Sequence, residues 1–378
     1  MNKFLNDEIS NTILKFALKI FMFKYWFQPV QKSDYNSECD IINNINFYSS
    51  DETSTLSNSD IVIFTDNSLI ARNFRKHFYQ FADHFQDLKI VDLGILRNCN
   101  EEFIVPILHE LLEINCIPIF VVKDMESIGS IFSILKQQSN YFSVAFMDAL
   151  LRCNDKKDNF YKNILLKYGE KMHDFAHLGY QTHLNELEEI IFYLDHELDI
   201  FRLGSVKTQI NSYEPILRDK NALIIHLSSL YSSNNLVSQH SSPAGFSIEE
   251  ASQLAFYSGE SDISNYFGIV TGAKNDIAST VDEQNIATLI WYFLDGISNR
   301  SNDYPINTSN MIKYNIKITA HNEDLIFWKS QKSEKWWFEI IKVKNRKKTR
   351  SFVPCSFTDF LTAKNNQVPE KYLKALSK

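Results

Sequence analysis

The stretch DIVIFTD (60–66) decides the fold, because it is the first of a series of short apolar runs that alternate with helical patterns. The other runs are KIVDLG (89–94), CIPIFVV (116–122), FSVAFMD (142–148), DIFRLG (199–204), ALIIHLS (222–228) and FGIVTG (267–272). Helical patterns follow at 68–86, 101–114, 126–138, 157–170, 247–259 and 282–298. Such alternation is typical of βαβ units, and strands that are apolar throughout are buried on both faces. The sequence therefore predicts a three-layer α/β/α domain with a mostly parallel sheet over residues 60–302.

Two segments of different character flank this domain. Residues 1–59 predict an amphipathic helix at 8–27 followed by a polar linker. That helix has lysines on one side and aromatic residues on the other, so it either docks on its own domain or lies on a membrane surface or a partner. Residues 303–378 predict a β-rich, aromatic extension packed on the core, with strands at 312–320, 324–330 and 336–343. The basic run KNRKKTR (344–350) is either a solvated hairpin tip or a contact for phosphates.

The composition excludes several classes of protein. The net charge of −7 does not favour nucleic acid as a partner. Only 10 of the 378 residues are glycine, and neither a GxGxxG nor a GxxxxGK[ST] phosphate loop is present. The five cysteines form no CxxC pair, which is typical of reduced thiols, and lysines interrupt the apolar N-terminal stretch. We therefore expect a cytoplasmic protein without a transmembrane segment.

Ligands of parallel sheets collect at the carboxyl ends of the strands, so we looked for chemistry there. The side chains at those ends are Asp66, Asp92, Lys123, Asp124, Asp148, Gly204, His226, Ser228 and Thr271. Asp148 and His226 are the only plausible metal ligands among them, and a two-metal hydrolytic site needs a larger set of carboxylates and imidazoles. Their neighbours Met125, Leu150 and Arg152 do not supply it, and an arginine repels a cation. The sequence predicts no functional metal site.

A series of short motifs runs in a fixed order along residues 60–372. They are DLG (92–94), IPIF (117–120), FMDA (146–149), GYQ (179–181), FRLG (201–204), SPAGFS (242–247), FGI (267–269) and IWYF (290–293). This order resembles the ureohydrolases, the family of arginase, agmatinase and formimidoylglutamase. The endings KWWFEI (335–340), FVPCSFTDFLTA (352–363) and VPEKY (368–372) resemble the formimidoylglutamase-like branch found in Bacteroidetes. The resemblance implies an arginase-like sheet of about eight strands.

The resemblance also implies two manganese ions that activate a bridging hydroxide for attack on a guanidinium or formimidoyl carbon. Most positions that match the family's ligands carry other residues here, and only Asp148 matches. The departures are Lys123-Asp124-Met125 after the third strand, Leu150 and Arg152 after Asp148, His226 and Ser228 in place of two aspartates, and Thr271 in place of a glutamate. We expect these residues to form a vestigial pocket in which Lys123 and Arg152 neutralise Asp148 in place of the metal.

Two functions follow as hypotheses. The first is a catalytically inactive ureohydrolase-like protein without a cofactor, with a binding, scaffolding or regulatory role toward an unknown protein partner or small ligand. The second is a metal-dependent hydrolase of a linear amidine or guanidino C–N bond, with manganese held by a non-standard set drawn from Asp148, His226, Asp124 and Glu126. The resemblance also makes a homo-oligomer plausible.

Three weaker candidates remain. His173 and His177, with His183 nearby, would form a metal-binding face if they lay on a helix. His109 and Glu110 lie in HELLE, which lacks the second histidine of a zincin. Cys153 lies next to Arg152, so it is a candidate for an activated thiol.

Overall fold

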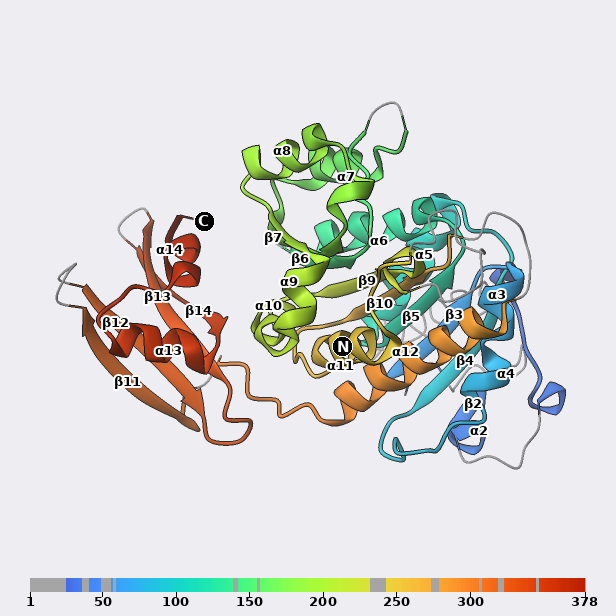
Figure 1. Cartoon of the computed structure of the whole chain (residues 1–378). Coiled ribbons are helices and arrows are strands. Elements are labelled where there is room, and N and C mark those ends of the chain that lie inside the picture. Colours follow the sequence, from blue (N-terminus) through green and yellow to red (C-terminus); the bar gives the residue numbers. More distant parts are fainter. Residues whose placement is uncertain are drawn as a thin grey trace, which may run out of the picture.

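The computed structural model consists of an α/β unit and a separate antiparallel sheet, joined by an extended segment (Figure 1). It describes residues 25–35, 41–48, 56, 59–138, 142–154, 157–231, 243–272, 279–305, 308–318, 323–344 and 347–377. The helix predicted at 8–27 lies almost wholly outside the described residues, as do parts of the linker predicted at 31–59.

Ten strands form the main sheet, in the order β1-β4-β3-β5-β10-β9-β6-β7-β8, with β2 paired to β4. Their bounds are β1 Phe27–Gln28, β2 Ile45–Phe47, β3 Ile61–Thr65, β4 Ile90–Leu96, β5 Ile117–Val122, β6 Phe142–Met147, β7 Met172–Tyr180, β8 Asp199–Arg202, β9 Ala222–His226 and β10 Tyr266–Val270. Among the strands that the structure describes in this sheet, only β1 runs antiparallel to its neighbour. The predicted mostly parallel sheet is confirmed, and β1 and β2 extend it beyond the strands expected.

Helices cover both faces of this sheet, as Figure 1 shows. Their bounds are α2 Ile41–Asn44, α3 Leu69–Asn73, α4 Arg75–Phe78, α5 Glu101–Glu113, α6 Met125–Gln138, α7 Phe160–Tyr168, α8 Leu187–Asp195, α9 Leu203–Thr208, α10 Glu214–Leu217, α11 Ile248–Gly259 and α12 Thr280–Ser298. Alternate residues of one strand enter opposite cores: Ile63 packs with residues of α11 and α12, and Phe64 packs with residues of α5, α6 and α7. This is the three-layer α/β/α arrangement predicted.

Some predicted elements differ from the structure. The long helix expected at 68–86 is two short helices, α3 and α4, which meet at Phe74. The segment 172–180, on which a histidine-bearing helix was considered, is strand β7. Strand β7 pairs with β6 on one side and β8 on the other, and its residues 175–180 are buried. Polar residues within the segment interrupt the apolar run by which a buried strand is recognised in a sequence.

The N-terminal segment takes part in the main sheet. Phe27 is fully buried and pairs with Leu96 of β4, and Ile45 pairs with Ile90 on the same strand. Strand β2 differs from the linker predicted for residues 31–59, because the polar residues around it concealed a three-residue strand in which only Ile45 is buried. No helix among the described residues combines the length and hydropathy needed to cross a lipid bilayer.

The C-terminal unit is an antiparallel sheet with two helices, as the β-rich pattern predicted. Its elements are β11 Met311–Ile318, β12 Glu323–Ser330, β13 Trp336–Lys344, β14 Lys347–Cys355, α13 Phe357–Lys364 and α14 Glu370–Ser377. Phe327, Phe338, Phe360 and Tyr372 form its core against the helices. The basic run at 344–350 falls at the end of the β13–β14 hairpin, and the side chains of residues 342–349 lie outside what the structure describes.

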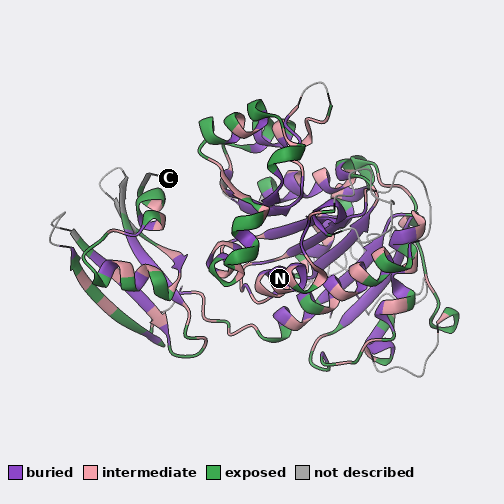
Figure 2. Cartoon of the chain, viewed as in Figure 1, coloured by how far each residue is buried: buried purple, intermediate pink, exposed green. Residues whose placement is uncertain are grey.

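Arg218 connects the two units. Its guanidinium lies 4.4 Å from the centre of the Trp337 ring, and its Nη2 donates to the Cys355 carbonyl oxygen at 3.0 Å. Lys335 adds an ion pair to Glu260 at 3.0 Å. Figure 2 shows buried residues through both sheets, with exposed residues on the outer faces of the helices. The C-terminal unit thus has its own core and contacts the α/β unit mainly through polar groups.

Candidate functional site

Four adjacent strands bring the predicted site residues to one edge of the sheet. In the order β5, β10, β9 and β6, the strands end at or just before Lys123, Thr271, His226 and Asp148. The pairing register of the strands places these residues at about the same level along the strand direction. Val270 lies opposite both Val122 and His226, and Met147 lies opposite Ile225. The four residues therefore lie along the carboxyl edge, where the sequence predicted them.

Asp148 is completely buried at this edge, and both its carboxylate oxygens accept hydrogen bonds. Oδ2 accepts from Arg152 Nε at 2.6 Å and from the Tyr161 hydroxyl at 3.1 Å. Oδ1 accepts from the Ser228 hydroxyl at 2.7 Å and from the Leu150 amide at 3.1 Å. A carboxylate offers about four lone-pair positions, so the acceptor capacity of Asp148 is used within the protein.

Electrostatics keep this carboxylate ionised. Burial by itself would raise the pKa of Asp148, but the positive charge of Arg152 outweighs it, assisted by the neighbouring His226, and holds the pKa well below its usual range. Arg152 is itself buried at 6% exposure, and the proximity of Asp148 raises its pKa against the opposing effect of burial. The pair is therefore charged at every pH near neutrality.

Arg152 reaches Asp148 from a strained backbone. Its φ is 44°, in the left-handed region that costs a non-glycine residue on the order of 1 kcal/mol. A second ion pair joins Arg152 Nη1 to Asp158 Oδ2 at 2.5 Å, while Nη2 is buried without a hydrogen-bond partner among the described residues. The sequence analysis expected Arg152 to neutralise Asp148, and the geometry agrees.

Lys123 does not join this pair, contrary to the expectation that it helps to neutralise Asp148. Among the described residues, no ion pair links Lys123 to Asp148; the Lys123 amide instead donates to Asp66 Oδ2 at 2.5 Å, and its carbonyl accepts from Gly272. Asp124 is exposed, and Met125 is buried in the core beneath α6. Asp66 also accepts from the amide and hydroxyl of Ser68, so it organises the ends of β3 and β5.

His226 is held between a backbone amide and a glycine. Its Nδ1 accepts from the Ser228 amide at 3.0 Å, which assigns this nitrogen as unprotonated in the neutral ring. A Cβ at Gly272, where φ is +59°, would lie 2.5 Å from His226 Cε1, so glycine is required for the ring to sit there. Thr271 is buried, and its hydroxyl has no hydrogen-bond partner within the described part of the chain.

The sequence patterns indicate neither Tyr161 nor Asp158 as residues of the site, and they offer His177 only as a metal ligand on a helix. Tyr161 and Asp158, in and before α7, contact Asp148 and Arg152, and His177 on β7 contacts the Asp148 carbonyl through Nε2 at 3.0 Å. Burial lowers the pKa of His177 to about 4, so its ring is neutral at pH 7. No local pattern marks these residues, because β7 and α7 bring them to the site only in the folded chain.

Two strand-end candidates lie elsewhere. Asp92 is within β4 rather than at its end, and it accepts from Arg75 Nε at 2.8 Å and from the Tyr79 hydroxyl at 2.5 Å, all fully buried. Gly204 lies in α9. Asp92 is therefore part of a buried structural ion pair, and neither residue belongs to the site.

The weaker candidates are not supported as reactive groups. Burial raises the pKa of Cys153 to about 12, the opposite of an activated thiol. His109 forms an ion pair with Glu113 on α5. His177 is buried on β7 and His183 is exposed beyond it, while the His173 side chain lies outside the described residues. The histidine-bearing helix is thus wrong.

The residues present do not fit a manganese ion. Across the described residues, no group of three or more His, Cys, Asp or Glu side chains is placed to hold a metal. A cation at Asp148 would have to displace Arg152, Tyr161 or Ser228 from its oxygens, and the fixed charge of Arg152 would repel it.

This arrangement of strands and helices occurs in known enzymes. A formiminoglutamase of Trypanosoma cruzi superposes with a TM-score of 0.56 at 16% identity, covering 65% of this chain and 98% of that one. The chain has the ureohydrolase fold. The formimidoylglutamase of Bacillus subtilis gives 0.56 at 14% identity, covering 64% and 88% of the two chains. The agmatine ureohydrolase of Thermoplasma volcanium gives 0.52 at 12% identity, covering 65% and 92%.

Sequence comparison adds no relative. No protein-family model matches the chain, and no curated protein matches it. The solved ureohydrolase-fold structures are covered almost completely by about two thirds of this chain. About one third of the chain therefore has no counterpart in them.

Proposed function

We propose that this protein is a catalytically inactive ureohydrolase-like protein that acts by binding. The observation that carries the proposal is the ion pair of Arg152 and Asp148, 2.6 Å between Nε and Oδ2, at the edge of the sheet where the resemblance places the metal cluster. A side-chain cation in the place of a metal ion leaves no site for a bridging hydroxide. The buried pair supports the fold instead.

The surroundings of the pair support the same proposal. The hydroxyls of Tyr161 and Ser228 and the amide of Leu150 use the acceptor positions that a metal would need. Met125 and Leu150 offer no nitrogen or oxygen side-chain ligand where the resemblance implies histidines. The substitutions are consistent with each other at Asp148, because all four hydrogen bonds to its carboxylate come from groups of the protein itself.

The metal content of the purified protein tests this proposal. The protein is incubated with manganese, desalted and analysed by inductively coupled plasma mass spectrometry, with Asp148→Ala and the control Asp195→Ala, at an exposed carboxylate on α8, beside it. We expect less than about 0.1 equivalent in all three. Incubation with formimidoyl and guanidino compounds is expected to give no hydrolysis product.

Retention of one metal ion or more per chain would contradict the proposal if Asp148→Ala lost it and Asp195→Ala kept it. That result would favour the alternative, a manganese-dependent hydrolase of a linear amidine or guanidino C–N bond with a non-standard ligand set. Retention that is equal in the three proteins would indicate surface binding and would leave the inactive centre as proposed.

A further inference from the structure

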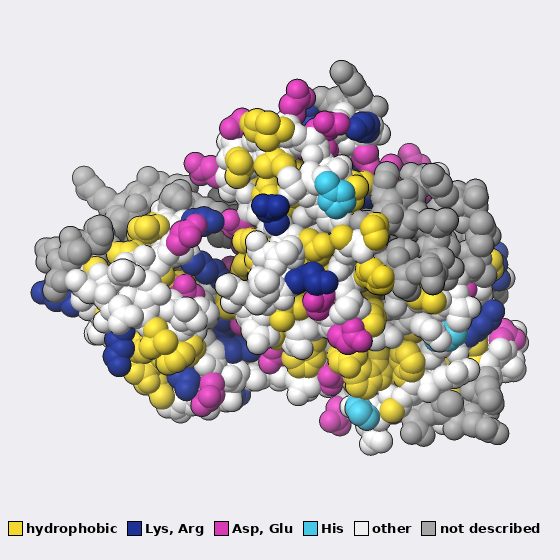
Figure 3. Space-filling model, in the orientation of Figure 1, with side chains coloured by type: hydrophobic (Ala, Val, Ile, Leu, Met, Phe, Trp, Pro, Cys, Tyr) yellow, Lys and Arg dark blue, Asp and Glu magenta, His cyan; other side chains and the backbone are white. Residues whose placement is uncertain are grey.

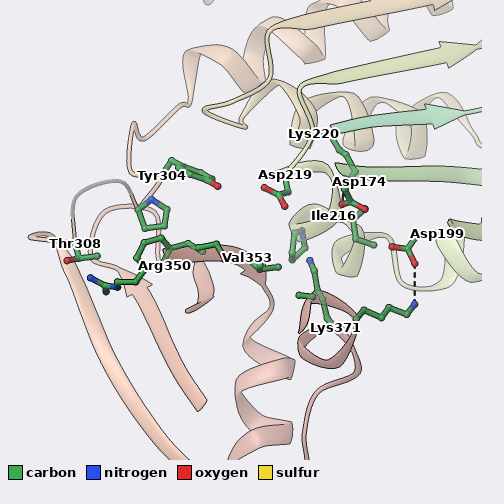
Figure 4. A pocket seen from close by; sticks show the side chains of 16 residues that line it. Asp174, Asp199, Ile216, Asp219, Lys220, Tyr304, Thr308, Arg350, Val353 and Lys371 are labelled. Atoms are coloured by element: carbon green, nitrogen blue, oxygen red, sulfur yellow. Dashed lines mark hydrogen bonds and ion pairs between the residues drawn. The ribbon is translucent and has the colours of Figure 1, made fainter. Parts of the chain in front are cut away.

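A pocket of about 620 Å³ lies between the C-terminal unit and the α/β unit (Figure 4). One wall is formed by β14 and α14, another by β7 and by α10 with the residues after it, and a third by the connecting segment near Tyr304. Its volume is in the range of small-molecule sites. None of the residues around Asp148 lines it, so it is separate from the vestigial centre.

Most charges around this pocket are already paired. Lys220 forms an ion pair with Asp174, and Lys374 pairs with Asp199 at 3.2 Å. Arg350 Nε pairs with Glu339 at 2.7 Å. Figure 3 shows such basic and acidic side chains together along the boundary of the two units. These pairs fix the walls and leave little net charge.

Lys371 and Asp219 are the exceptions. The Lys371 ammonium is buried and has no hydrogen-bond partner among the described residues, and no ion pair there joins it to Asp219. Burial lowers the pKa of Lys371 and raises that of Asp219 to about 6. Figure 4 shows the Lys371 ammonium and the Tyr304 hydroxyl directed toward Asp219. The buried Lys371 ammonium, with three unused donors, faces the partly buried Asp219 carboxyl across the pocket.

Beside the hydroxyl-bearing Tyr304, Thr308 and Ser351, the rest of the lining is apolar. Ile216 lies on the α/β side, Phe352 and Val353 lie on β14, and Ala375 lies on α14. These side chains would bury a hydrocarbon group next to the polar pair, and such burial stabilises a complex in proportion to the apolar area removed from water. The pocket therefore combines one unpaired positive group, one unpaired negative group and an apolar wall.

We propose that this pocket binds a zwitterion with an apolar side chain, an α-amino acid, with the ligand carboxylate on Lys371 and its ammonium on Asp219. A ligand with both charges satisfies both protein groups without adding net charge to a buried site, whereas a simple anion would be repelled by Asp219. The inference deepens the proposed binding role by naming its ligand class. The test of amino-acid binding is independent of the metal analysis, so either hypothesis can fail while the other stands.

Isothermal titration calorimetry of the full-length protein with three matched probes tests the inference. The probes are L-phenylalanine, 3-phenylpropanoate, which lacks the ammonium, and 2-phenylethylamine, which lacks the carboxylate. We expect L-phenylalanine to bind about tenfold or more tightly than either analogue, because each analogue leaves one buried charge unsatisfied.

Two variants locate the binding. Lys371→Met is expected to weaken the binding of L-phenylalanine by about tenfold to a hundredfold, and to leave the affinity for 2-phenylethylamine unchanged. Asp219→Asn is expected to weaken the binding of L-phenylalanine without weakening that of 3-phenylpropanoate. Lys364→Met, an exposed lysine on α13, is the matched control and is expected to bind like the unaltered protein. Circular dichroism melting verifies that each variant is folded.

Three results would overturn the inference. They are the absence of L-phenylalanine binding at about 10 mM, equal affinity for the three probes, and undiminished binding in folded Lys371→Met. The metal content of the protein has no bearing on any of them.

Discussion

Arg152 Nε lies 2.6 Å from Asp148 Oδ2 in a pair that is almost completely buried. The two residues are four positions apart, yet no helix joins them; Asp148 ends β6 and Arg152 takes a left-handed backbone conformation in the loop that follows. The loop is thus shaped so that an arginine turns back on the strand it has just left. A cation belonging to the chain occupies the neighbourhood of the one carboxylate that matches the family's ligands.

This relationship predicts a strong effect on stability. Arg152→Ala leaves Asp148 as an uncompensated buried charge and is expected to lower the free energy of unfolding by about 3–5 kcal/mol, measured by urea denaturation. The double variant Asp148→Ala, Arg152→Ala is expected to lose less than the sum of the single variants, because neither charge is then left alone.

Lys157→Ala serves as the control, since Lys157 pairs with Glu186 on the surface and its loss is expected to leave the free energy of unfolding nearly unchanged. Strictly additive effects of the two buried substitutions would show that the pair has no energetic coupling.

His177 predicts a dependence of stability on acid pH. Burial lowers its folded-state pKa to about 4, whereas an unfolded histidine titrates near 6.5. The unfolded state therefore binds the additional proton as the pH falls from about 6.5 to 4, and stability is lost over this interval, up to about 3 kcal/mol. His177→Gln should flatten that part of the profile. The exposed His183→Gln should not, and an unchanged profile in His177→Gln would refute the assignment.

Asp219 predicts the opposite slope. Burial raises its folded-state pKa to about 6, so the folded state holds the proton between about pH 4 and 6. Stability is expected to fall as the pH rises through this interval, by up to about 3 kcal/mol. The charged groups that act on this carboxyl are Lys220, Asp174, Lys371 and Arg218, and the neutral Tyr304 hydroxyl is directed toward it.

The effects of His177 and Asp219 oppose each other in the unaltered protein, so single variants are needed to separate them. In urea denaturation at pH 4 to 7, Asp219→Asn should abolish the decrease in stability with rising pH. Asp195→Asn, at an exposed carboxylate at the end of α8, should retain it. If the decrease in stability with rising pH persisted in Asp219→Asn, another group would be its cause.

Arg218 predicts how the C-terminal unit is held. The substitution Arg218→Ala removes the contact with the Trp337 ring and the hydrogen bond to the Cys355 carbonyl. We expect it to lower the free energy of unfolding by about 2–3 kcal/mol. The C-terminal unit should then become susceptible to limited proteolysis in the connecting segment near Tyr304. Lys313→Ala, which removes a cation over Trp328 away from the junction, is the control. Equal protection of both variants would show that other contacts hold the unit.

The sequence by itself determined the α/β unit and most of the site's edge. Apolar runs such as ALIIH (222–226) are specific for buried parallel strands, and parallel strands necessarily end at one edge, which places Asp148 and His226 together. The presence of Leu150 and Arg152 beside Asp148, on which the proposed inactivity depends, was also readable from the local sequence. The β-rich character of the C-terminal unit followed in the same way from alternating aromatic residues.

Only the tertiary structure decided the partners of these groups. Tyr161, His177 and Ser228 reach Asp148 from three different elements, and Lys123, adjacent to the site in the strand order, satisfies Asp66 instead. The strands of the N-terminal segment and the pocket at Lys371 were likewise absent from any local pattern. Hydrophobic periodicity records which side of an element is buried, whereas a hydrogen bond between distant residues depends on side-chain directions that packing alone fixes.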